Sequence, residues 1–178
     1  MKTLTLTLAA TLLTVTATRT QGTHPATLEL DGGVTVPLAA QAKRADLAGS
    51  IEFYDVALYA DVPLADRARL TSPETPKAVR IVITYAPDLR RPITLEWQRE
   101  LVPALEAPAI AELRRIFAPL RRGDVVQIDY GRSRGTTLRI DRDTAVTRGS
   151  HDLVLAFFDH WIGQRPVSEE IKRALLGR

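Results

Sequence analysis

Alternating hydrophobic and polar positions divide much of the chain into segments typical of β-strands. The clearest spans Ile51–Ala60, where aromatic and β-branched residues follow Gly49-Ser50. Glycine-rich turns at Asp31-Gly32-Gly33 and Gly131–Gly135 are typical of hairpins. Further strands are predicted at Ala26–Leu30, Val34–Pro37, Leu38–Asp46, Lys77–Tyr85, Val125–Tyr130, Thr136–Asp141 and Ala145–Thr147.

Other segments show helical spacing of their apolar residues. They are Leu64–Leu70, Thr94–Leu105, Pro108–Phe117, Ser150–Ile162 and Ser168–Leu176. We expect Ser150 and Ser168 to cap their helices, and Gly163 to end the fourth as a left-handed residue. Strands, helices, strands and helices thus follow in turn. This order predicts an α+β domain with a mostly antiparallel sheet and helices on one side.

The first 17 residues are typical of a secretory signal peptide. Lys2 precedes an uncharged apolar run, and small residues at Val15 and Ala17 suit cleavage after Ala17. The run is too short to span a bilayer as a helix, so we expect no stable membrane insertion. The alternative is an amphipathic strand, because residues 3–8 alternate Thr and Leu. We therefore predict one domain, residues 18–178, in a periplasmic or secreted protein.

Composition excludes several kinds of chemistry. The 178 residues include no Cys, which rules out disulfides, thiolate nucleophiles and Cys-ligated metals. The net charge of +3 is too balanced for a dedicated nucleic-acid binder, so no nucleic-acid partner is expected. His24, His151 and His160 lack metal-ligand spacing, and Gly131–Gly135 lacks the Lys and following helix of a phosphate loop. We expect neither a metal nor a cofactor.

Four segments together resemble the chalcone isomerase-like superfamily. They are Ile51–Ala60, Glu96–Glu100, Arg122–Tyr130 with Gly135–Thr137, and Phe158–Gly177 with its Trp-x-Gly-x-x-Pro-Val turn. The resemblance extends from about Leu28 to Gly177, and the signal peptide suits the bacterial exported branch. It implies an open-faced β-sandwich, in which a layer of helices covers a large antiparallel sheet. A cleft between the two layers would hold a flat or elongated apolar ligand.

Members of this superfamily either cyclise chalcones or bind fatty acids without catalysis, and both kinds hold an anionic oxygen with an Arg. Asp46 stands at that position here, and Arg44, two residues earlier, would face the same way on a strand. Tyr54 stands at the polar position of the signature strand, where the enzymes have a Thr, and a Tyr there is similar to the fatty-acid-binding members. Trp97 lies at or beside the catalytic Tyr, and an indole cannot exchange a proton in the relevant range. The resemblance therefore implies that most of the catalytic residue set is absent, and no residue is assigned a catalytic role.

The sequence thus favours a non-catalytic binder of a small amphipathic ligand, such as a fatty acid. Arg44 and Tyr54 would hold its polar end. Trp97 and Trp161 are the other candidate binding residues, although their apolar helical neighbours favour core packing. Two alternatives remain: an isomerase of the intramolecular lyase type, and a structural or interaction module whose cleft has closed.

Overall fold

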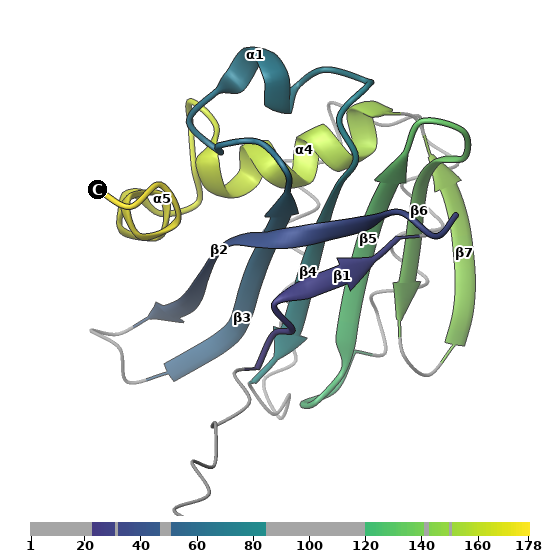
Figure 1. The fold of residues 1–178 in the computed structure, drawn as a ribbon. Coiled ribbons are helices and arrows are strands. Elements are labelled where there is room, and N and C mark those ends of the chain that lie inside the picture. Colours follow the sequence, from purple (N-terminus) through teal and green to yellow (C-terminus); the bar gives the residue numbers. More distant parts are fainter. Residues whose placement is uncertain (1–22, 31, 47–50, 85–119, 141–142, 150) are drawn as a thin grey trace, which may run out of the picture.

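A seven-stranded antiparallel sheet organises the chain. The structure, a computed structural model, describes residues 23–30, 32–46, 51–84, 120–140, 143–149 and 151–178. Within them the strands are β1 (Thr27–Glu29), β2 (Thr35–Asp46), β3 (Ile51–Ala60), β4 (Lys77–Ile83), β5 (Val125–Gly131), β6 (Gly135–Ile140) and β7 (Asp143–Gly149). They lie side by side in sequence order, and each pairs antiparallel with the next (Figure 1). The connection from β3 to β4 includes α1, and the connection from β4 to β5 passes through residues 84–124.

The described helices share a core with one face of this sheet, called here the inner face. They are α1 (Arg67–Leu70), α4 (His151–Ile162) and α5 (Glu169–Leu175). α4 contacts β4, β5 and β6, whereas α5 contacts β2. The predicted α+β fold, an antiparallel sheet covered by helices, is therefore confirmed. The helices predicted over residues 94–117 and the signal peptide predicted over residues 1–17 lie outside the described residues.

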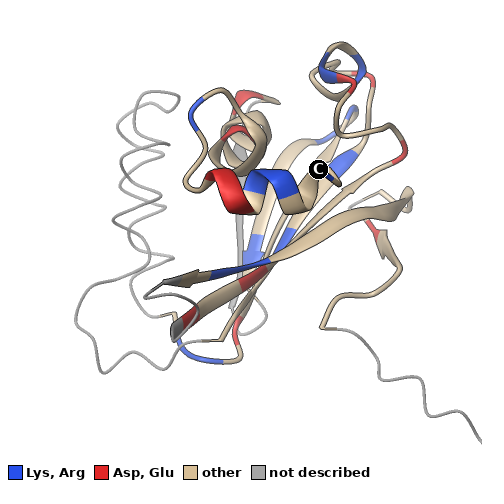
Figure 2. Cartoon of the chain, turned by 90° about the vertical axis from the view of Figure 1, so that its left-hand side faces the viewer, with Lys and Arg blue, Asp and Glu red and all other residues tan. Residues whose placement is uncertain are grey.

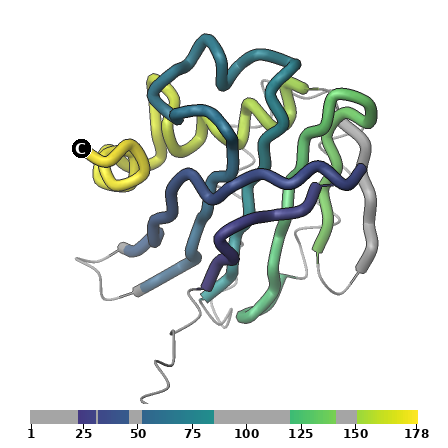
Figure 3. Tube along the Cα trace, in the orientation of Figure 1, coloured from purple at the N-terminus to yellow at the C-terminus, as the bar shows by residue number. Residues whose placement is uncertain are grey.

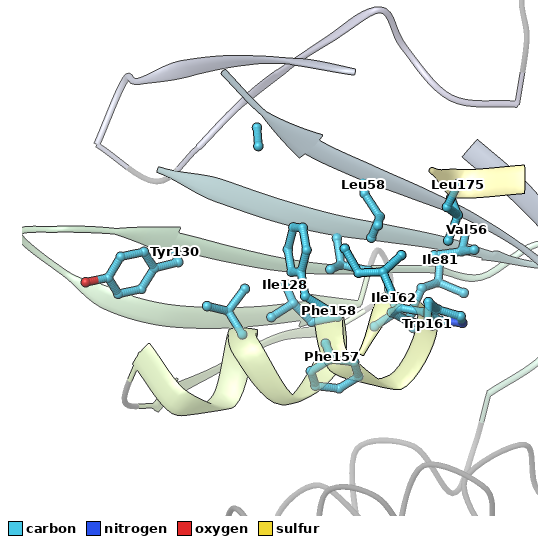
Figure 4. Packing of buried hydrophobic residues seen from close by; sticks show 14 of the residues in the cluster. Val56, Leu58, Ile81, Ile128, Tyr130, Phe157, Phe158, Trp161, Ile162 and Leu175 are labelled. Atoms are coloured by element: carbon cyan, nitrogen blue, oxygen red, sulfur yellow. The ribbon is translucent and has the colours of Figure 1, made fainter. Parts of the chain in front are cut away.

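Large side chains fill the space between α4 and the inner face. Figure 4 shows Phe158, Trp161 and Ile162 of α4 between the helix and the strands. These three side chains are between 0% and 4% exposed. Burying one large apolar side chain contributes roughly 1.5–3 kcal/mol to folding, so this layer supplies much of the stability. Where α4 crosses the sheet, the interior is packed core.

β2 is bent, and its first half leaves the sheet edge to cover the outer face. Register shifts occur between Leu38 and Ala40 and between Arg44 and Ala45. The tube in Figure 3 shows the start of β2, with β1, passing across the strands that follow. A second apolar cluster forms beneath it, made of Leu28, Leu30, Val36, Ala57, Tyr59 and Ala78. Both faces of β3 are therefore covered.

The start of α5 and the end of α4 depend on two different local features, a side-chain cap and a glycine. As predicted, Ser168 caps α5, with its hydroxyl accepting from the Ile171 amide at 3.3 Å. The prediction for Gly163 is wrong, because its φ does not lie in the left-handed region. A Cβ atom at this position would instead lie 2.4 Å from the Asp159 carbonyl oxygen. Glycine is required here by close backbone approach.

Candidate functional site

Tyr54 and Trp161 form a buried polar contact between the sheet and α4. Neither side chain is exposed to solvent, and the indole Nε1 donates to the Tyr54 Oη at 3.1 Å. The rings meet edge-on, with centroids 6.2 Å apart and an angle of 73° between planes. Because an indole N–H only donates, this bond does not use the phenolic hydrogen of Tyr54. Trp161 therefore orients the phenol of Tyr54.

Arg44 lies directly across the strands from Tyr54. The two residues are partners in the β2–β3 register, so their side chains start on the same face of the sheet. Next to this pair Phe53 is the extra residue of a bulge, and the Arg44 guanidinium carbon lies 6.0 Å from the centre of its ring. Arg44 is half-buried, and its Nη1 donates to the Ala45 carbonyl oxygen at 2.9 Å. The residue that pairs with Tyr54 across the strands therefore carries a permanent positive charge.

His160, next to Trp161 in α4, adds a buried titratable group to this region. Its ring centroid lies 5.0 Å from that of Trp161, and the residue is 3% exposed. Burial, assisted by the positive charge of Arg44, lowers the pKa of His160 to about 4. At neutral pH the ring is uncharged. Within the described part of the chain, neither ring nitrogen has a hydrogen-bond partner.

Three of the four predicted binding residues are placed by the structure. Tyr54 and Trp161 are in contact, and Arg44 lies opposite Tyr54 in the register. Trp97 lies outside the described residues. The backbone of Asp46 pairs with Ile51 at the end of β2, and its side chain also lies outside the described residues. It is therefore Arg44, and not Asp46, that pairs with Tyr54.

A second buried polar cluster lies toward the other end of α4, where Figure 4 places Tyr130 far from Trp161. Lys77 is fully buried, and its Nζ lies 2.8 Å from both the Ser72 carbonyl oxygen and the His151 Nε2. The Tyr130 ring lies against both side chains. Burial lowers the pKa of Lys77 to about 8. These contacts fix the loop before β4 to the sheet and α4, and sequence reasoning missed them because the partners are 74 residues apart.

The arrangement at Arg44 and Tyr54 suits an anionic oxygen. Arginine carries its charge at any physiological pH, and a phenol donates one directed hydrogen bond.

Among the described residues no group of His, Asp and Glu side chains could hold a metal ion. None of the described helices has the length and apolar character needed to cross a membrane.

The sequence that forms this sheet and its helices matches a known protein family. Residues 38–177 match the chalcone isomerase-like family, and the chain belongs to it. No curated protein matches the sequence. Among solved structures, a fatty-acid binding protein of Arabidopsis thaliana is similar, with 14% identity and a TM-score of 0.57. The match covers 84% of this chain and 95% of the plant protein. At this identity the likeness shows the fold alone.

Proposed function

We propose that the protein binds a small amphipathic ligand, such as a fatty acid, without catalysing a reaction. The observation that carries this proposal is the pairing of Arg44 with Tyr54 across β2 and β3, beside Trp161. A carboxylate accepts a charge-assisted hydrogen bond from a guanidinium and a second bond from a phenol. The family and the fatty-acid-binding structural neighbour support the same class of ligand.

A closed interaction module is the second candidate, and one observation favours it. Tyr54 and Trp161 are both fully buried, so a ligand must displace other side chains to reach the phenol. If the interior stays closed in solution, the same residues only hold α4 on the sheet. A binding measurement separates the two candidates.

Saturable binding of palmitate by the purified protein is the expected result, with a strong dependence on both polar residues. Tyr54→Phe and Arg44→Gln should each weaken binding about 10- to 100-fold, because each removes a hydrogen bond to a charged group. Isothermal titration calorimetry measures this effect at a temperature where each variant is folded. Absence of saturable binding by the unaltered protein would favour the closed module.

Lys43→Gln is the matched control for Arg44→Gln. Lys43 precedes Arg44 on β2, is exposed and pairs with Glu52, with 3.1 Å between its Nζ and the carboxylate. Successive strand residues point to opposite faces, so this variant removes the same charge from the other side of the strand. An equal loss of affinity in both variants would contradict a site at Arg44.

Hydroxychalcone should not cyclise faster than its spontaneous rate in the same preparation.

We also propose that the chain belongs to the bacterial exported branch of its family and acts in the periplasm or outside the cell. The charge and apolar pattern of residues 1–17 supports this location. Expressed in a bacterial host, the protein should be recovered from the periplasmic fraction with Thr18 as its first residue. Intact-mass measurement of the fraction tests this. A full-length, cytoplasmic product would contradict the proposal, and Ala17→Leu should block cleavage if the predicted site is correct.

A further inference from the structure

A groove lies along the flank of α4 that carries His160. It is enclosed by the segment entering α1, by α4, and by the chain from Gly163 to the end of α5 and beyond. Its volume is about 680 Å³, within the range of pockets that hold small molecules. On the helix, Ala156, Asp159, His160 and Gly163 line it, as expected for residues spaced three and four apart. Neither Tyr54 nor Arg44 lines the groove.

Basic side chains dominate the lining. The lining has one acidic residue, Asp159. It has four basic residues, which are Arg67, Arg165, Lys172 and Arg178. Arg67 forms an ion pair with Asp159, and the Lys172 Nζ donates to the Gly163 carbonyl oxygen at 2.7 Å. Figure 2 shows that α5 begins with acidic residues and continues with basic ones, and Lys172 lies in the basic half. The groove therefore has a surplus of positive charge that attracts anions.

His160 supplies the second, independent feature of this groove. It is 97% buried yet lines the groove, and neither ring nitrogen is hydrogen-bonded within the described part of the chain. A buried polar group without a partner is costly, so a bound acceptor at this ring would stabilise the protein. The charged groups around the ring are Arg44 from β2, Asp159 from α4, and the basic residues of the groove. A surplus of positive charge near the ring favours an anionic acceptor.

We propose that this groove binds a small organic anion, with its carboxylate or phosphate group between His160 and the basic side chains. Leu64, Ile162 and Leu176 add apolar surface to the lining, which favours an anion with an apolar part over an inorganic ion. Neither Arg44 nor Tyr54 lines the groove, although Arg44 acts electrostatically on His160. The proposal does not rest on the proposed function.

The test uses phenyl phosphate and benzoate as probes of the full-length protein, with benzyl alcohol as the neutral analogue. At least one anion should bind saturably in calorimetry, more weakly as salt is added, and benzyl alcohol should not bind. Arg165→Gln and His160→Gln should each weaken binding about tenfold. In NMR titrations the bound anion should raise the pKa of the His160 ring and leave that of His24 unchanged.

Arg173→Gln is the control. Arg173 lies on α5, is exposed and does not line the groove, so the affinity for the anion should stay unchanged. The proposal is overturned if neither anion binds, if Arg173→Gln weakens binding as much as Arg165→Gln, or if the His160 resonances do not respond.

Discussion

Acidification from pH 7 to pH 4 is expected to lower the free energy of unfolding by several kcal/mol. The effect comes from two buried histidines, His24 and His160, whose pKa values in the folded protein are both lowered to about 4 from 6.5. Between these pH values the unfolded chain binds two more protons than the folded protein at these residues. Stability is therefore fully present above pH 6.5 and is lost as the pH falls toward 4, by up to about 3 kcal/mol for His160 and by less for His24, which solvent screens more.

The physical cause differs slightly between the two residues. Burial lowers the pKa of each, with Arg80 adding repulsion at His24 and Arg44 adding it at His160. His24 lies on the outer face, where its Nδ1 is 3.1 Å from the Arg80 Nη1. Burial and the neighbouring Lys77 also lower the pKa of His151, so that residue acts in the same direction. The whole histidine set thus destabilises the fold in acid.

Urea denaturation between pH 7 and pH 4.5 measures this dependence. The double variant His24→Gln and His160→Gln should show a much shallower decline, because glutamine does not titrate. Each single variant should lie between the double variant and the unaltered protein. If the double variant declines as steeply as the unaltered protein, protonation of carboxylates is the cause and this explanation is wrong.

Replacing Trp161 with alanine is expected to cost about 3–5 kcal/mol of stability at pH 7, the range for large-to-alanine changes in a core. The indole is fully buried between α4 and the sheet, stacks near Phe157 with ring centroids 6.3 Å apart, and donates to Tyr54. Its removal leaves a cavity and takes away the partner of the Tyr54 oxygen. Urea unfolding monitored by circular dichroism measures the loss.

A double-mutant cycle isolates the hydrogen bond within this loss. Tyr54→Phe leaves the buried indole N–H without that acceptor, which should cost about 1–3 kcal/mol. Trp161→Phe removes the donor and keeps much of the ring. Combining the two should cost less than the sum of the single variants, because no unpaired polar group of this bond then remains. Additive losses would show that the bond does not form in solution.

Much of the fold was predictable from local sequence patterns. Aromatic and β-branched residues after Gly49-Ser50 predicted β3 with its observed bounds, and turn residues at Gly32-Gly33 and Gly131–Gly135 predicted the hairpins β1–β2 and β5–β6. Such patterns involve only residues close together in the sequence, so they can be interpreted without knowledge of the fold. The burial of Trp161 and the capping of α5 by Ser168 are confirmed for the same reason. Trp97 as a binding residue stays a prediction.

The site was only partly predictable. Arg44 and Tyr54 stay predicted binding residues, and their pairing depends on the β2–β3 register and on the bulge at Phe53. A one-residue slip in register would turn Arg44 away from Tyr54. The contact of Tyr54 with Trp161 joins residues 107 positions apart. No local pattern contains that information.

The sequence by itself determined the class of fold, the approximate places of the described strands and the ends of α4 and α5 to within one residue, because these follow from the period and turn chemistry of adjacent residues. The need for glycine at position 163 is also local, since the obstacle is the Asp159 carbonyl one helical turn earlier. Only the tertiary structure decided that His160 is buried, with its pKa lowered to about 4, and that it lines a basic groove. Burial and electrostatic surroundings come from several segments at once, and these meet only when the chain is folded.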